Sequence, residues 1–179
     1  DPMVEGNVIV DISVDKREKI KVNDIIVVGN EAMTLAKIDR VMKKTNRSGK
    51  IANLFRAKKF VEKEYENDKK VLIEKYNEIG YRDAAILRDS VVKRDDGTVD
   101  VYIELEEGKK YYFGDIKWLG NTLYPSEYLN QLLNVEKGEV YNLKDLNKRL
   151  FEDEDAVSAL YKDNGYLFMN IDPVEVGIN

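Results

Sequence analysis

Carboxylates are the side chains most able to do chemistry in this sequence, because it contains no histidine and no cysteine. A pair such as Glu62 and Glu66 could share general acid and base work, and the run Glu152–Asp155 could suggest a metal site. Consecutive positions on a helix point in different directions, so four adjacent acids do not converge on one ion. No acid is visibly paired with a nucleophile or base, and we therefore expect no enzyme, no metal and no other cofactor.

A basic segment, residues 43–59, is the second candidate, within a chain whose formal net charge is −5. The segment holds seven positive charges and no acid, and it could attract anionic lipid, an acidic protein surface or nucleic acid. The alternative is a solvated loop between helices, since charge runs usually only solvate. The acidic balance of the whole chain argues against a nucleic-acid partner. The candidate residues are Lys43, Lys44, Arg47, Lys50, Phe55, Arg56, Lys58 and Lys59.

An internal repeat organises the elements that would position these groups. Residues 6–30 and 97–121 share nine identities in 25 positions, at a constant offset of 91. Further on, Tyr76–Tyr81 (YNEIGY) recurs as Tyr161–Tyr166 (YKDNGY) at an offset of 85. Self-similarity of this kind indicates an array of similar modules, each roughly 90 residues long. With 43% hydrophobic and 35% charged residues, and no apolar run long enough to span a membrane, the composition is that of a soluble globular protein.

Each module is predicted to run strand, helix, helix, strand, strand. Apolar alternation and helical periodicity define these elements, and two helices on one face of a three-stranded sheet give an α+β module. In the first copy the expected strands are 21–28, 82–93 and 99–105, with a hairpin turn at 95–97. The alternation is irregular around Arg88 and Asp89, which predicts a bulge in that strand.

Two aspartates interrupt the apolar stripe of the longer helix at equivalent positions of the two copies. The stripe is Val61, Tyr65, Leu72 and Tyr76 in the first copy, and Leu146, Leu150, Val157 and Tyr161 in the second. Burying an unpaired carboxylate is costly. We therefore expect Asp68 and Asp153 each to accept hydrogen bonds from backbone N–H groups of the preceding loop.

The repeat also predicts the division of the chain. Residues 1–18 are expected to be the last strand of a preceding module, 19–108 a complete module, and 109–179 a second module without its last strand. In that second module, 167–176 would be the strand before the missing one. Because both cut ends leave open edges, the N-terminal strand of one chain could complete the C-terminal sheet of another, giving a strand-exchanged dimer.

At this point the residues resemble a known family, the POTRA modules (polypeptide-transport-associated repeats). The resemblance rests on the βααββ order, the strand ending in Gly29-Asn30, the helix exit with Tyr76, Gly80 and Tyr81, and the link at Glu106–Gly108. It implies tandem α+β modules, each with a three-stranded mixed sheet and two helices on one face. It also implies that the last strand is central and that the second strand is an open edge.

POTRA modules form the soluble periplasmic arm of BamA-type outer-membrane assembly proteins. The resemblance therefore implies a scaffold in the periplasm that binds unfolded outer-membrane proteins and accessory lipoproteins, with periplasmic chaperones as a further class of partner. An open edge presents unpaired N–H and C=O groups, so an extended client can add to it as another strand. The candidate edge residues are Ala84, Ala85, Ile86, Leu87, Arg88, Ser90 and Val92, and in the second copy Leu167, Met169 and Ile171.

Other interpretations remain open at this stage. The edges could be merely tolerated features, protected from aggregation by Arg88, Asp89 and Lys93. The chain could be a module of a cell-division or two-partner-secretion protein. It could also be an electrostatic adaptor that binds anionic membrane or nucleic acid through residues 43–59, and steep salt sensitivity would distinguish that function.

Overall fold

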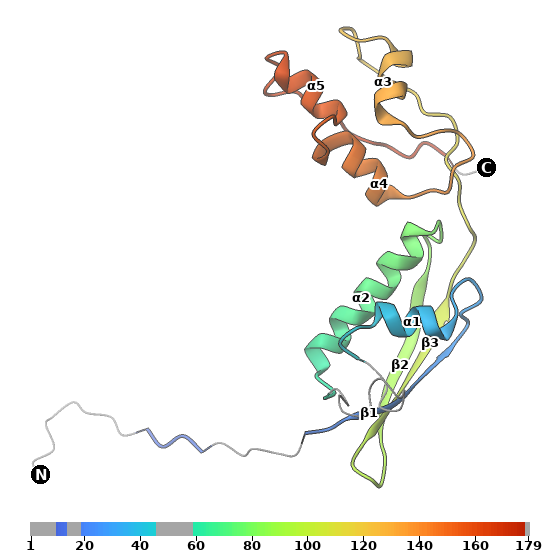
Figure 1. The fold of residues 1–179 in the computed structure, drawn as a ribbon, viewed down its shortest axis with the longest axis vertical. Coiled ribbons are helices and arrows are strands. Elements are labelled where there is room, and N and C mark those ends of the chain that lie inside the picture. Colours follow the sequence, from blue (N-terminus) through green and yellow to red (C-terminus); the bar gives the residue numbers. More distant parts are fainter. Residues whose placement is uncertain (1–9, 14–18, 46–58, 178–179) are drawn as a thin grey trace, which may run out of the picture.

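The structure is a computed structural model and describes residues 10–13, 19–45 and 59–177 (Figure 1). The first repeat contains a three-stranded sheet and two helices. In chain order these elements are β1 (Val22–Val28), α1 (Leu35–Val41), α2 (Glu62–Glu78), β2 (Ala85–Lys93) and β3 (Val99–Glu106). The predicted order of strand, helix, helix, strand, strand is therefore confirmed for this repeat.

The sheet is mixed, with the strand order β1-β3-β2. β3 lies in the centre, parallel to β1 on one side and antiparallel to β2 on the other. The antiparallel pair is closed by the hairpin expected at residues 95–97, where Gly97 has a φ of 81°. The α+β class is confirmed, with α1 and α2 over one face of the sheet (Figure 1).

The core follows from the alternation of β3. Its four inward side chains are almost completely buried, namely Val99, Val101, Ile103 and Leu105. Ile25 and Val27 of β1 are buried beside them, as their alternation predicts. Three helical residues, Ile38, Leu72 and Tyr76, belong to the same buried cluster. Val61 does not join this stripe, because it precedes the first turn of α2 and is exposed.

Gly29 allows β1 to end close against β3. Its φ is 84°, and a Cβ atom there would lie 1.9 Å from the carbonyl oxygen of Leu105. Only glycine tolerates both the positive φ and this approach. Gly120 is the equivalent residue of the second repeat and has a φ of 78°, but no atom of the described chain lies within 4 Å of its Cβ position. The second repeat thus makes the same turn without a neighbouring strand.

Asp68 fastens the loop after α1 to α2. Its carboxylate accepts hydrogen bonds from the backbone N–H groups of Lys44 (2.8 Å) and Thr45 (2.6 Å), and the residue is 3% exposed. The expectation that this buried carboxylate satisfies backbone donors of the preceding loop is confirmed.

The expectation for Asp153 is wrong. The second repeat does not form one long helix here but three short segments, α4 (Leu143–Asn147), the π-helical turn η2 (Lys148–Glu152) and α5 (Val157–Asp163). Asp153 lies at the break between them, half-buried. It pairs with Lys148 and Arg149, each at 3.5 Å. A carboxylate that reaches side-chain cations at the surface does not need the backbone donors that Asp68 requires.

The second repeat has its own smaller core. Its first helix is α3 (Ser126–Leu133), and the buried cluster consists of Leu129, Leu133, Leu150 and Val157. Ile116 and Trp118 pack against this cluster and Lys117 is exposed, as the sequence predicts.

Two predicted strands are not found in the second repeat. Residues 113–121 and 167–177 are irregular, and Tyr112, just before the first of these segments, forms an isolated bridge with Val140. In the first repeat both equivalent strands pair with the central β3. In the described part of the second repeat, no strand takes the place of β3, so neither segment has a central strand to pair with.

Residues 10–13 are also not a strand. They are exposed, with Val10 at 70% and Ile12 at 83%, and they form no ladder with any described strand. The rest of the strand predicted near the N-terminus lies outside the described residues. Within the described part of the chain, no helix has the length and apolar character needed to cross a membrane.

Replacing Asp68 with alanine should destabilise the first repeat strongly. Asp68→Ala leaves the buried N–H group of Thr45 and the partly buried N–H group of Lys44 without their acceptor, and we expect the free energy of unfolding to fall by about 2 to 4 kcal/mol. Urea unfolding followed by circular dichroism measures this. The matched control is Asp153→Ala, which removes only surface ion pairs and should cost less than about 1 kcal/mol. Equal losses in the two variants would contradict the structural role assigned to Asp68.

Candidate functional site

β2 is an open edge of the sheet. It pairs with β3 along one side, and no described strand pairs with its other side. An unpaired edge of nine residues is long enough to template another strand. The resemblance implied this arrangement, and the strand order agrees with it.

The ladder decides which residues of β2 present their backbone to the edge. Opposing residues of an antiparallel pair alternate between those that exchange hydrogen bonds and those that direct their N–H and C=O groups away. Arg94 donates to the carbonyl oxygen of Thr98 at 2.9 Å, which sets this alternation at the hairpin. Val92 and Ser90 are two and four residues earlier, respectively, and therefore face β3. Asp89, Val91 and Lys93 face the open edge.

A bulge at Leu87 changes the alternation near the start of β2. Ile86 pairs with Leu105 and Arg88 with Glu104, so Leu87 is an extra residue. Because of this insertion, Ile86 and Asp89 both lie on the helix-covered side although they are three residues apart. The bulge predicted around Arg88 and Asp89 is confirmed. Leu87 itself is 57% exposed.

A hydrogen-bonded cluster joins the edge strand to α2. The hydroxyl of Tyr65 donates to Asp89 at 2.8 Å, and the Lys69 amine donates to the same carboxylate at 3.0 and 3.1 Å. Lys69 also pairs with Glu66 at 2.8 Å and lies 4.8 Å from the centre of the Tyr65 ring. The cluster fixes the middle of β2 against the helix.

The electrostatics of this cluster favour neutral tyrosine and charged lysine. Burial raises the pKa of Tyr65 well above its ordinary value, and the hydrogen bond to Asp89 raises it further. Burial alone would lower the pKa of Lys69, but hydrogen bonds to Glu66 and Asp89 raise it overall. Asp89 therefore keeps two donors at neutral pH.

A shallow groove of about 440 Å³ runs between α2 and β2 beside this cluster. Ile73 and Ile86 supply its apolar surface, and charged groups of both signs surround them. The lining residues are Glu66, Lys69, Lys70, Ile73, Glu74, Ile86 and Asp89. The edge therefore has main-chain groups for pairing and, next to them, a small surface that a client side chain can contact.

Most of the predicted edge residues of the first repeat are accessible. Ala85, Leu87, Arg88, Ser90 and Val92 are exposed and Ile86 is half-buried. Ala84 is an exception, because it precedes β2 and is buried in the core with 7% exposure.

The second predicted edge differs from the first. Leu167 is exposed, and Met169 and Ile171 are half-buried, but none of the three lies in a strand. Ile171 packs against the second core instead.

The structure describes only the two ends of the basic segment. Lys43, Lys44 and Lys59 are exposed, and the backbone N–H of Lys44 is bound to Asp68. The other five candidates, Arg47, Lys50, Phe55, Arg56 and Lys58, lie outside the described residues.

Tyr65 and Lys69 are site residues that sequence reasoning missed. The sequence pattern predicts Tyr65 only as part of the core stripe, where it is indeed buried, and it predicts no role for Lys69. Their spacing of one helical turn is a signal that both face the same neighbour. The bulge that turns Asp89 toward them could not be placed to one residue from the pattern alone.

The fold and the edge define a class of protein, an α+β repeat module that exposes one strand of a mixed sheet. The family model described as "POTRA: Surface antigen variable number repeat" matches residues 20–108 and again 111–179. Since the two matches cover most of the 179 residues, the chain belongs to the POTRA family.

Two curated relatives cover almost the whole chain. The outer membrane protein assembly factor BamA of Neisseria meningitidis serogroup B is 26% identical over 171 residues, which is 94% of this chain. A putative outer membrane protein assembly factor of Treponema pallidum is 25% identical over 166 residues, or 90% of the chain. The chain spans only 21% and 19% of these relatives.

A solved structure supports the fold. The crystal structure of Haemophilus influenzae BamA POTRA3-5 matches with a TM-score of 0.55 at 22% identity. The match covers 79% of this chain and 58% of that one.

Removing the Tyr65 hydroxyl should weaken the attachment of β2 to α2. We expect Tyr65→Phe to lower the free energy of unfolding by about 1 to 2 kcal/mol, because Asp89 loses a buried donor. The matched control is Tyr102→Phe, on the uncovered face of β3, with an expected change within about 0.5 kcal/mol. Urea unfolding at neutral pH compares the two variants, and equal effects would show that the Asp89 contact is not stabilising.

The same contact predicts a dependence on alkaline pH. Because folding raises the pKa of Tyr65, its stabilisation is complete below the unfolded value of about 10 and is lost as the pH rises above it. The difference in stability between the protein and Tyr65→Phe should therefore shrink above that pH. A constant difference would contradict the assigned shift.

Proposed function

We propose that this chain is part of a periplasmic scaffold that assists assembly of outer-membrane β-barrel proteins by binding extended segments of unfolded precursors. The open edge of β2 carries the proposal. Membership of the POTRA family and the names of both curated relatives support it. The proposed scaffold function assigns no catalytic role to any residue.

The physical basis is backbone pairing. Asp89, Val91 and Lys93 direct their N–H and C=O groups to the edge, and a client can pair with these groups whatever its side chains. The adjacent groove adds contact with Ile73 and Ile86, so segments with an apolar side chain at every second position are favoured. Strands of membrane barrels have this alternation.

Further parts of the proposal concern the rest of the chain. Residues 1–18 would belong to a preceding module, 19–108 to a complete module and 109–179 to another, whose segment around Leu167–Ile171 becomes an edge once its central strand is present. Accessory lipoproteins and periplasmic chaperones would be partners of the larger protein. A second copy of this chain could supply the central strand through its N-terminal segment, and deletion of residues 1–14 would then abolish dimer formation measured by light scattering.

A titration with a strand peptide tests client binding. We expect an alternating apolar and polar peptide, copied from a barrel strand, to shift backbone amide NMR signals of residues 85–93 at both low and high salt, because main-chain pairing is little screened. Shifts confined to residues 43–59 that vanish with salt would contradict strand addition and assign binding to the basic segment.

Two methylated peptides provide the matched control. Both keep every side chain, but one carries N-methyl groups on the odd residues and the other on the even residues. A strand that adds to the edge uses the N–H groups of only one set, so one peptide should lose binding and the other should keep it. Equal binding of both peptides would exclude main-chain pairing.

A further inference from the structure

The turn after α2 is buried under the second repeat. Gly80 has a φ of 96°, and its carbonyl oxygen accepts a hydrogen bond from the N–H of Tyr111 at 2.8 Å. A Cβ atom on Gly80 would lie 2.8 Å from Cγ1 of Val140 and 3.1 Å from both Cγ of Lys110 and the carbonyl oxygen of Tyr111. The turn thus touches two segments that are 30 residues or more away in sequence.

Those two segments are held together by backbone hydrogen bonds. Phe113 donates to the carbonyl oxygen of Glu139 at 2.8 Å, and Tyr141 donates to that of Tyr111 at 3.0 Å. Tyr111 and Tyr141 are consequently neighbours on one short ladder, and both rings face the turn from the first repeat.

Arg82 projects from the turn toward these rings. Its guanidinium carbon is 5.3 Å from the centre of the Tyr111 ring and 5.9 Å from that of Tyr141. Its Nη1 atom lies 2.5 Å from the carboxylate of Glu175, which also accepts a hydrogen bond from the Tyr141 hydroxyl. These hydrogen bonds, that of Tyr141 first, lower the pKa of Glu175, so the carboxylate is ionised at neutral pH.

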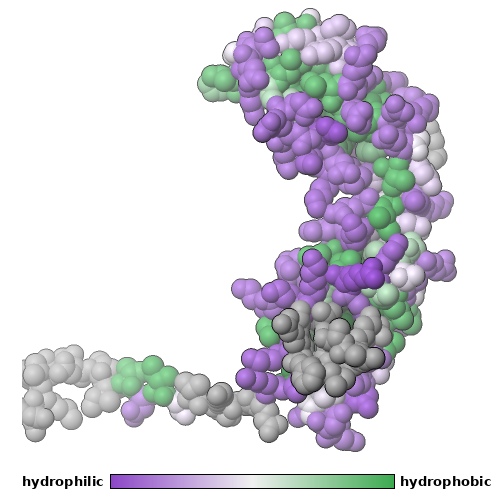
Figure 2. Space-filling view, in the orientation of Figure 1, coloured by the Kyte–Doolittle hydropathy of each residue, from purple (hydrophilic) through white to green (hydrophobic). Residues whose placement is uncertain are grey.

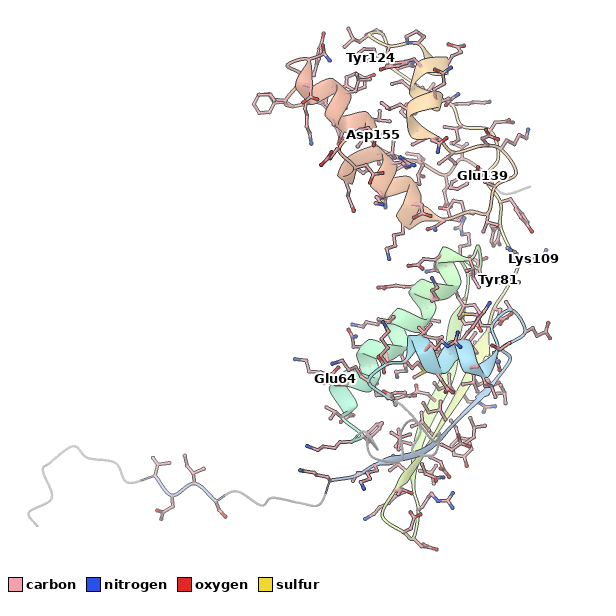
Figure 3. All side chains as sticks on the ribbon, viewed as in Figure 1. Glu64, Tyr81, Lys109, Tyr124, Glu139 and Asp155 are labelled. Atoms are coloured by element: carbon pink, nitrogen blue, oxygen red, sulfur yellow. The ribbon has the colours of Figure 1, made fainter. Side chains whose placement is uncertain are left out.

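Two more contacts flank this centre. The hydroxyl of Tyr111 donates to Asp83 at 2.5 Å. On the other side, Lys144 at the start of α4 pairs with Glu78 at the end of α2, at 2.7 Å. Figure 2 shows the two repeats joined through this region, and Figure 3 labels Tyr81 and Lys109 there.

The second repeat contains the same turn without these contacts. Tyr166 donates to the carbonyl oxygen of Tyr161 at 3.1 Å, as Tyr81 donates to that of Tyr76 at 3.0 Å. Gly165 has a φ of 90°, yet nothing in the described part of the chain lies within 4 Å of its Cβ position. Local sequence therefore makes the turn, and the contacts around Gly80 belong to the joint between the repeats.

We propose that the turn Gly80–Asp83 is a latch that fixes the angle between the two repeats. In its closed state the Arg82 guanidinium lies against the rings of Tyr111 and Tyr141 and pairs with Glu175. Since β2 begins two residues after Asp83, the latch also holds the segment around Glu175 beside the start of the open edge. The repeats then move as one body, and opening the latch lets the second repeat swing away from β2.

Distance measurements between the repeats test the latch. The chain has no cysteine, so a spin label can be placed at each of two exposed helical sites, Asn67→Cys on α2 and Gln131→Cys on α3. Double electron–electron resonance then reports the distribution of distances between the repeats. We expect one narrow distribution in the otherwise unchanged chain.

Two variants open the latch by different means. Arg82→Met keeps an unbranched apolar stem but removes the charged guanidinium group, and Gly80→Ala forces a methyl group into the joint. Both should broaden the distribution and shift its mean. The controls are Arg88→Met, an ion-paired arginine on β2, and Gly165→Ala, which adds the same backbone strain where there is open space.

The outcomes separate the latch from a folding defect. Circular dichroism shows whether each variant is folded, and Arg82→Met tests the latch even if Gly80→Ala does not fold. A narrow, unshifted distribution in folded Arg82→Met would overturn the proposal. A broad distribution in the unchanged chain, or equal broadening in the controls, would overturn it as well.

Discussion

The central position of β3 is the constraint on which the rest of the structure depends. A three-stranded sheet with the order β1-β3-β2 gives each outer strand one partner only, and that partner is the last strand in sequence. The side chains of Val101 and Ile103 are buried at the middle of the sheet. Gly29 has no side chain, so the end of β1 can lie close to the backbone of Leu105. In the second repeat, where no described segment takes this place, the residues equivalent to β1 and β2 form no sheet although their side chains still pack against the helices.

The same constraint creates the candidate binding edge. With β3 between them, β1 and β2 cannot pair with each other, and β2 keeps one side open. The bulge at Leu87 and the cluster of Tyr65, Lys69 and Asp89 hold this strand against α2 without closing its outer side. At its beginning, the contacts of Gly80 and Arg82 connect the edge to the second repeat. One edge of β2 is therefore paired with β3, and its other edge stays available for pairing with a client.

Much of the fold could be predicted because the sequence contains it twice. Comparison of the two copies predicts the order of strands and helices in the module, the inward faces of β1 and β3, and the role of Asp68 as a buried hydrogen-bond acceptor. Asp153 shows where this reasoning fails. Its position is equivalent, but Lys148 and Arg149 are within reach and the helix breaks there, so a surface ion pair replaces the backbone hydrogen bonds. The site was only partly predictable, since side-chain clusters such as Tyr65 with Asp89 depend on a one-residue bulge, and the joint depends on contacts between distant segments.

Amide hydrogen exchange along β2, measured residue by residue by NMR, tests most directly whether this strand is an open edge that accepts a client. In the free protein the amides of Asp89, Val91 and Lys93 should exchange rapidly, whereas those of Ser90 and Val92, paired with β3, should exchange slowly. A bound strand peptide should slow the first three and leave the other two unchanged. If all five are already slow in the free protein, or if the peptide slows none of the first three, the edge is not the client site.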